Sequence, residues 1–227
     1  MSDPVIWLQT GTGRAFDLLQ PAAAMVDFGI DLAEALARIP RFNGHVRSGG
    51  YSVAQHSVMG ADELYRETGR HDLAAAFLLH DGREFVLGDK PTPVKWAEIA
   101  IIREMFGPVV AEQARKAMHE LGVRADRAIY ARAGVPFPLE PSMAEAVKTM
   151  DRRMAKTEFM HLLGKPALPL DPAIASARPI RLLGKFRVWP WPEAADEFRA
   201  RLTAYLPARH KAATRRAPAR RPEPLEA

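Results

Sequence analysis

The sequence predicts an all-α protein, a compact helical bundle around one hydrophobic core. Most of the chain has apolar residues at helical spacing, and glycine or proline marks the ends of these stretches. A chain of 227 residues, 48% of them hydrophobic, can bury about two thirds or more of its unfolded surface in a single core. There is no internal repeat and no second hydrophobic unit, so we expect residues 1–206 to form one domain.

The N-terminal segment departs from the helical pattern. Polar and apolar residues alternate on both sides of the Gly-Thr-Gly sequence at 11–13, which favours a short β-hairpin. The predicted helices follow at residues 31–39, 52–68, 72 through the apolar run 73–79, 95–106, 108–121, 126–133, 140–163 and 192–206. Their boundaries carry residues that begin or end helices, namely Pro40, Ser52, Gly69, Pro91, Thr92, Gly122, Gly134 and Gly164. The proline-rich stretch 165–191 is predicted to be irregular.

The positive charge of the chain is concentrated at its C-terminus. The formal net charge is +5, of which residues 207–227 supply +4 and the remainder about +1. This segment is rich in Pro, Ala and Arg and lacks apolar periodicity, so we expect a disordered tail. Such a tail serves solubility or makes loose contact with nucleic acid or another polyanion, and elsewhere the sequence gives no sign of nucleic-acid binding.

The composition also excludes several kinds of site. There is no cysteine, so disulfides, thiolate metal sites and a cysteine nucleophile are excluded, and a metal must use nitrogen and oxygen ligands. No stretch approaches the roughly 18 uninterrupted apolar residues of a membrane span, and the first residues do not resemble a secretory leader. We therefore expect a cytoplasmic protein without membrane contact. A homo-oligomer is compatible with the sequence.

One place in the chain sets a histidine directly beside a carboxylate at the end of an apolar helix. The run 74–79 would bury that helix and deliver His80 and Asp81 at the edge of the core, where unpaired polar groups are costly. A shared cation is the simplest way to satisfy both side chains. The dipeptide alone is weak evidence, because His71-Asp72 repeats it.

Two further polar residues interrupt apolar helix stripes. His56 lies where the 52–68 helix should face the core, and the alternative is a core histidine bonded to a carbonyl. Asp151 lies in the middle of the 140–163 helix, and its alternative is an ion pair with a neighbouring basic residue. Together with His80 and Asp81, they would suit a divalent ion such as Mn²⁺, Co²⁺, Fe²⁺ or Mg²⁺, with positions left open for water and substrate.

These residues fall in a recognisable order. The stretch HDGREFVLGDKPTPVK at 80–95, preceded by YSVAQHS at 51–57 and Arg-Phe at 41–42, resembles the HD-domain metal-dependent phosphohydrolases. It is most similar to their 5′-deoxynucleotidase branch and to related phage and bacterial nucleotide hydrolases. The resemblance covers roughly residues 25–165. It implies a compact helical fold, hydrolysis of nucleotide phosphate esters, and a metal held by four residues, His56, His80, Asp81 and Asp151.

The resemblance also implies roles for residues around the metal. Glu84 matches the acidic residue that positions or deprotonates the attacking water; without the motif, a surface carboxylate paired with Arg83 is as plausible. Asp89 matches a carboxylate that contacts the sugar, although a Gly-Asp turn would explain it too. Arg41 matches a phosphate-binding arginine and Lys95 a lysine that would neutralise phosphate charge. Phe42 replaces a tryptophan that contacts the sugar, which puts the preference for deoxyribose in doubt.

The loop between Arg41 and His56 departs from the family pattern. His45 and Arg47 in this loop could donate to phosphate or could be solvated side chains of a Gly-rich loop. The first expectation for function is therefore a nucleoside 5′-monophosphate hydrolase. A dNTP triphosphohydrolase that uses His45, Arg47 and Lys90 is the alternative. A hydrolase of cyclic or alarmone nucleotides and a non-catalytic nucleotide- or nucleic-acid-binding module are less favoured, the last because the ligand set is intact.

Overall fold

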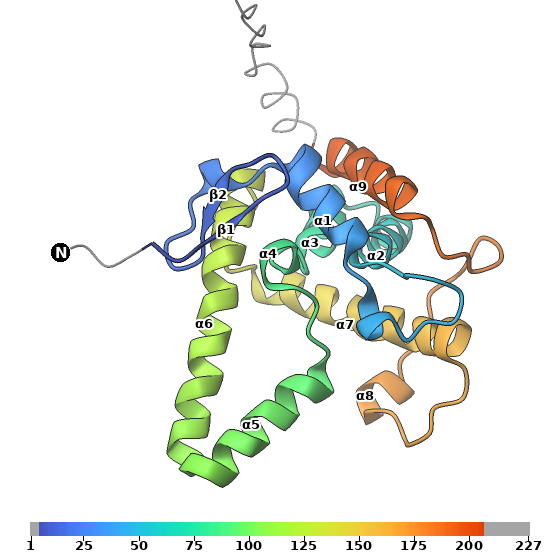
Figure 1. Ribbon diagram of the computed structural model, residues 1–227. Coiled ribbons are helices and arrows are strands. Elements are labelled where there is room, and N and C mark those ends of the chain that lie inside the picture. Colours follow the sequence, from blue (N-terminus) through green and yellow to red (C-terminus); the bar gives the residue numbers. More distant parts are fainter. Residues whose placement is uncertain (1–4, 207–227) are drawn as a thin grey trace, which may run out of the picture.

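The computed structural model describes residues 5–206, which form an all-α fold with one short antiparallel sheet near the N-terminus (Figure 1). The predicted fold class and the predicted hairpin are therefore confirmed. The predicted tail at 207–227 lies outside the described residues. Among the described residues, no helix has the length and apolar character to cross a membrane.

The hairpin is attached to the helical body through an aromatic contact. Strand β1 (Trp7–Gln9) pairs antiparallel with β2 (Ala15–Asp17). The residues of β1 are exposed, whereas Phe16 in β2 is buried, and its ring meets the ring of Phe85 edge-on with 5.2 Å between centroids. The sheet therefore contributes one face to the core and leaves the other in solvent.

The core is built from helices that are far apart in the sequence. They are α1 (Ala33–Arg38), α2 (Val53–Thr68), α3 (His71–Leu79), α7 (Pro141–Glu158) and α9 (Trp191–Tyr205). Helix α3 is central, because it packs against α2, α7 and α9 and every residue from 73 to 79 is buried. The apolar run of the sequence thus forms the middle of the bundle, as predicted (Figure 1).

The remaining helices connect or extend this core. They are α4 (Glu84–Leu87), α5 (Thr92–Phe106), α6 (Pro108–Ala133) and the one-turn α8 (Pro172–Ala175). Short 3₁₀ turns cover Ala23–Met25 and Arg41–Gly44, and π-helical turns cover Phe28–Leu32 and Phe159–Leu163. Apart from α8, residues 165–190 are irregular, as predicted, and Trp191 begins α9.

Two helix boundaries differ from the sequence prediction. The predicted helices 108–121 and 126–133 are one continuous helix, α6, because Gly122 lies inside it and the side chain of Arg83 packs over that glycine. A Cβ at Gly122 would lie 3.0 Å from an Arg83 nitrogen. Glycine at this position therefore leaves room for the Arg83 side chain and does not end the helix. The second difference is that the helix predicted at 95–106 begins three residues earlier, at Thr92. A turn separates α3 from α4, which begins at Glu84.

Helices α2 and α3 approach each other closely at Gly60. A Cβ added there would lie 2.1 Å from ring carbon Cε1 of Phe77, so only glycine fits. The ring of Phe77 in turn contacts two imidazoles, with its centroid 5.7 Å from that of His56 and 4.3 Å from that of His80. This contact therefore sets the distance between the two histidines.

We expect Gly60→Ala to lower the free energy of unfolding by about 1 kcal/mol. Overpacking a core costs about 1–3 kcal/mol, which exceeds the roughly 1 kcal/mol that alanine gains over glycine inside a helix. Chemical denaturation followed by circular dichroism measures the change. Gly184→Ala is the matched control, because nothing lies within 4 Å of a Cβ at that position. A Gly60→Ala protein as stable as the wild type would contradict the close approach of α2 and α3.

Candidate metal centre

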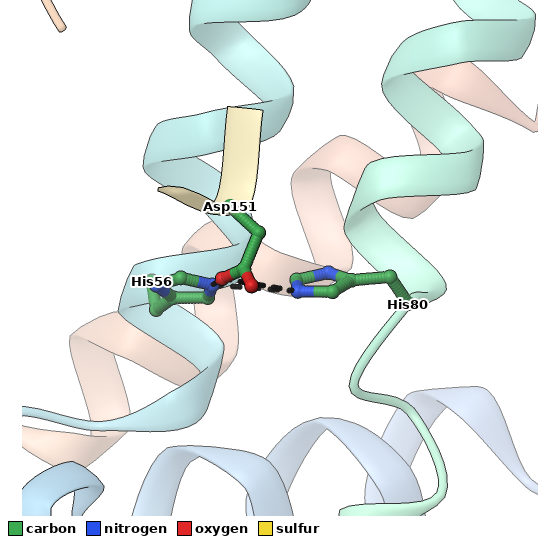
Figure 2. Close-up of side chains that lie close together, drawn as sticks. All are labelled: His56, His80 and Asp151. Carbon is green, nitrogen blue, oxygen red and sulfur yellow. Dashed lines mark hydrogen bonds and ion pairs between the residues drawn. The ribbon is translucent and has the colours of Figure 1, made fainter. Parts of the chain in front are cut away.

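Two histidines and an aspartate from three helical segments meet at one end of the core. His56 comes from α2, His80 follows the last residue of α3, and Asp151 comes from α7. Each offers one ligand atom, and the three atoms lie within 4.8 Å of one another. Figure 2 shows the Asp151 carboxylate between the two imidazole rings. Its Oδ1 is 3.4 Å from His56 Nε2 and 3.8 Å from His80 Nε2.

Asp81 lies at the edge of this cluster. Its Oδ2 is 3.2 Å from His80 Nε2 and 3.7 Å from His56 Nε2. The same oxygen accepts a hydrogen bond of 3.2 Å from Arg41 Nη1. The structure therefore brings together all four predicted metal ligands, with Asp81 also engaged by the arginine.

In each histidine, the ring nitrogen that points away from the cluster, Nδ1, forms a hydrogen bond that holds the ring in place. His80 Nδ1 is 2.6 Å from the carbonyl oxygen of Phe77, and His56 Nδ1 is 2.6 Å from Oε1 of Glu158. With the proton on Nδ1 in both rings, each Nε2 presents its lone pair to the cluster. Histidines that bind metals are held in this way, by an acceptor on the nitrogen that does not bind.

The donor set fits a divalent cation. The two Nε2 atoms are 3.4 Å apart, with carboxylate oxygens beside them. Without a cation or protons between them, these lone pairs would repel one another inside a cluster where His56 is fully buried. Imidazole and carboxylate ligands suit Mn²⁺, Fe²⁺, Co²⁺ or Zn²⁺, and a mixed set without thiolate is compatible with Mg²⁺.

Glu158 is a residue of this site that the sequence reasoning missed. Its side chain is fully buried, and besides His56 it accepts a hydrogen bond of 2.7 Å from the Tyr51 hydroxyl. Arg41 Nη2 lies 3.5 Å from its Oε2. Burial would raise the pKa of Glu158, but Arg41 and His56 lower it, so the carboxylate stays charged. The available signal was its position seven residues after Asp151, two helical turns along the same face of α7.

Glu84 is a buried acid without a hydrogen-bond partner. Only 8% of its surface is exposed, and its Oε2 bonds to none of the described residues. Burial, together with the negative charges of Asp81 and Asp89, raises the pKa of Glu84 to about 9. The predicted catalytic acid or base therefore lies in the electrostatic field of the cluster and not on the surface.

Arg41 faces the cluster from a strained turn. Its side chain is 14% exposed, and its Nε–H has no acceptor among the described residues. The two residues that follow, Phe42 and Asn43, have φ angles of 56° and 51°, which non-glycine residues rarely adopt. Strain of this kind is concentrated at functional sites. The ring of Phe42 lies beside Arg41 and packs edge-on against Phe159.

The other predicted substrate residues lie further out. Asp89 is half-buried, and burial raises its pKa while the positive charge of Arg41 opposes the shift. Lys95 is exposed on α5. His45 is also exposed, and no hydrogen bond or ion pair links it to the cluster within residues 5–206. Its role in binding phosphate therefore stays a prediction.

A cavity of about 800 Å³ opens on the other side of Glu84. It lies between α4, α5 and α6, and its lining includes Lys95, Trp96, Arg103 and Met118. None of the four candidate metal ligands lines it, whereas Glu84 does, and the charge of Asp81 acts on Glu84 from the cluster. The size is typical of a small-molecule site.

The fold and the cluster define a helical protein with a candidate metal centre of two histidines and carboxylates. No family model matches the chain. The chain is 33% identical over 202 residues to an uncharacterized protein of Rhodobacter capsulatus, a match that covers 86% of this chain and 93% of the relative. The chain therefore belongs to the same family as that protein.

We expect Glu158→Gln to weaken binding of Mn²⁺ about tenfold or more. Glutamine keeps the size and one acceptor oxygen but removes the charge that orients and polarises His56. Calorimetric titration of chelator-treated protein measures the affinity, and thermal denaturation of the same metal-free sample reports on folding. Glu145→Gln on the exposed side of α7 is the control. Unchanged affinity in Glu158→Gln would remove Glu158 from the site.

The affinity for metal is predicted to rise with pH. Burial would lower the pKa of His80, but Asp81 and Asp151 raise it well above its usual range, and the pKa of His56 is raised as well. In the metal-free protein these imidazoles therefore hold protons that a metal must displace. We expect the affinity for Mn²⁺ to increase between about pH 6 and pH 8, with release of protons. Calorimetry in buffers of different ionisation enthalpy measures both, and binding without proton release would contradict the assignment.

Proposed function

We propose that this chain is a metal-dependent phosphohydrolase of the HD-domain kind, and that it releases orthophosphate from (deoxy)nucleoside 5′-monophosphates. One observation carries the proposal. His56, His80 and Asp151 place their ligand atoms within 4.8 Å of one another, next to a buried acid and a half-buried arginine. The resemblance of residues 80–95 to the HD-domain phosphohydrolases supports the same function.

The metal would be held by His56, His80, Asp151 and Asp81, and Mn²⁺, Co²⁺, Fe²⁺ and Mg²⁺ are the candidates. When bound, a divalent ion lowers the pKa of water and polarises a phosphoryl oxygen. The four ligands come from three helical segments packed on one core, so their relative positions are fixed before substrate arrives.

Glu84 would handle the proton in the reaction. A carboxylate in a buried site, close to Asp81 and Asp89, has an unusually strong affinity for protons, as its raised pKa indicates. The positive charge of a bound divalent ion would lower this pKa. The carboxylate would then accept a proton at Oε2 as the oxygen of water bonds to phosphorus, and pass that proton to the ester oxygen as the phosphorus–oxygen bond breaks. The net products are a nucleoside and orthophosphate.

Arg41 would bind the phosphate group. Its Nε–H has no acceptor in the part of the chain that the structure describes, and its two terminal nitrogens lie beside Asp81 and Glu158, which hold the guanidinium in place. A fixed arginine stabilises the charge that spreads over the phosphoryl oxygens during transfer. Asp89 and Phe42 are the candidates for contact with the sugar, and Lys95 adds positive charge at the mouth of the cavity.

The structure gives less support to a triphosphate substrate. That alternative relies on His45, Arg47 and Lys90, but His45 and Arg47 are exposed and Lys90 Nζ is paired with Glu98 at 2.9 Å. A non-catalytic binding module would have no use for an unpartnered buried acid beside the metal ligands, and such a group is costly to keep. We therefore keep the monophosphatase ahead of both alternatives.

The test is a panel of nucleoside mono-, di- and triphosphates incubated with chelator-treated protein and Mn²⁺, Co²⁺ or Mg²⁺. Products are separated by chromatography. We expect orthophosphate and deoxyadenosine from dAMP, only when a metal is added. Inorganic triphosphate from dATP with dAMP untouched would contradict the preferred reaction, and no turnover of any phosphate ester would contradict the hydrolase.

In the same assay, Glu84→Gln should lower kcat about 100-fold or more while Mn²⁺ still binds. Glutamine keeps the size of the side chain but cannot take up the proton. Glu120→Gln is the control, because Glu120 forms only a surface pair with Arg124. An unaltered kcat in Glu84→Gln would leave Glu84 without a role in the reaction.

A further inference from the structure

Helices α5 and α6 form a hairpin that extends away from the core (Figure 1). Helix α5 packs chiefly against α6, and none of its residues is buried. In the first half of α6, Ala111 is the only residue before Gly122 that is buried. Helices in proteins owe most of their stability to packing of an apolar face, so this hairpin lacks the contacts that its length requires.

The hairpin exposes an apolar surface instead. Of the nineteen large hydrophobic side chains that are exposed within residues 5–206, eight belong to this one hairpin: Val94, Trp96, Ile101, Met105, Phe106, Val109, Val110 and Met118. The most exposed, Val109, Met105 and Trp96, have 69%, 66% and 64% of their surface in solvent. Trp96 and Met118 line the cavity between α4, α5 and α6, so they lie on the other side of the hairpin from the stripe of Val94, Ile101 and Met105. At roughly 100 Å² each, the other six expose on the order of 600 Å², the upper end for the largest apolar patch of a typical monomer. We call these six residues the hairpin face.

The chain's own unplaced ends do not supply a cover for this face. Residues 1–4 and 207–227 contain only Met1 and Leu225 as large apolar residues. A membrane surface or a nucleic acid would select a strongly basic helix pair. The hairpin instead mixes both signs, with Lys95, Arg103, Arg115 and Lys116 against Glu98, Glu104 and Glu112. Mixed charge around an apolar centre is the composition of a protein interface.

We propose that the hairpin face is covered by the same face of a second copy of this chain. Two helical hairpins that pack about a two-fold axis form a four-helix bundle, which gives α5 the apolar contacts that it lacks within one chain. The roughly 600 Å² exposed on each copy would give about 1,200 Å² of buried surface in total, the lower end for a specific protein interface. The presence of both charge signs on one hairpin allows it to be complementary to itself.

The dimer would also affect the cavity beside Glu84. Trp96 and Ile99 of α5 and Met118 of α6 are part of its lining. A second copy that packs on α5 and α6 would therefore fix one wall of this cavity. The inference itself does not depend on the proposed function, because it rests on the apolar surface alone.

Sedimentation velocity of the full chain, over concentrations from sub-micromolar to hundred-micromolar, tests the proposal. We expect a species of twice the 25.2 kDa chain mass. Phe106→Glu and Met105→Glu should each raise the dimer Kd by about 30-fold or more, because each buries a charge in the apolar centre. Both residues are more than half exposed, so the circular dichroism spectrum should not change. Leu183→Glu is the control, since Leu183 is 85% exposed and lies outside the hairpin.

The absence of cysteine allows a second measurement. Val109→Cys introduces a single thiol on the hairpin face, and a bifunctional maleimide should join two such chains, whereas Leu183→Cys should give little product. A wild-type monomer at every concentration would overturn the proposal, and so would dimers that persist in both glutamate variants. If the protein is monomeric and pellets together with anionic lipid vesicles, the face binds a membrane surface, and this result would also overturn the proposal.

Discussion

The close packing of α2 on α3 at Gly60 is the constraint on which the candidate site depends. The ring of Phe77 fills the space that a side chain at position 60 would occupy, and it lies against both His56 and His80. The two Nε2 atoms can approach to 3.4 Å because the two helix backbones lie close together there. Helix α7 then adds Asp151 to the pair and Glu158 behind it. The arrangement of the site is thus a property of the core.

Charge balance is the second requirement of this arrangement. Asp81, Asp151 and Glu158 lie around one half-buried arginine and two imidazoles, so each charge has a partner of opposite sign. Glu84 is the exception, since it has no partner among residues 5–206 and its pKa is raised to about 9. A perturbed acid next to a cluster of metal ligands is typical of a catalytic site and has no structural benefit of its own. The protein tolerates this cost where a reaction would use it.

The sequence predicted those parts of the structure that depend on local pattern. Apolar spacing located most of the helices, and polar residues on apolar stripes pointed to His56 and Asp151. The failures arise from tertiary contacts. Nothing near Gly122 in the sequence shows that Arg83 packs over it, and Glu158 at the end of an amphipathic helix has the sequence context of a solvated residue. The role of His45 stays a prediction, because a position in a loop does not determine which way its side chain points.

The central claim is that His56, His80 and Asp151 hold a metal ion. Electron spin echo modulation of Mn²⁺, added at one equivalent to the chelator-treated protein, tests this most directly, because it detects nitrogen bonded to the ion. We predict modulation from histidine nitrogen in the wild type, a weaker signal in His56→Ala or His80→Ala, and no change in the exposed control His119→Ala. A spectrum without nitrogen modulation, or one that neither cluster variant alters, would contradict the account.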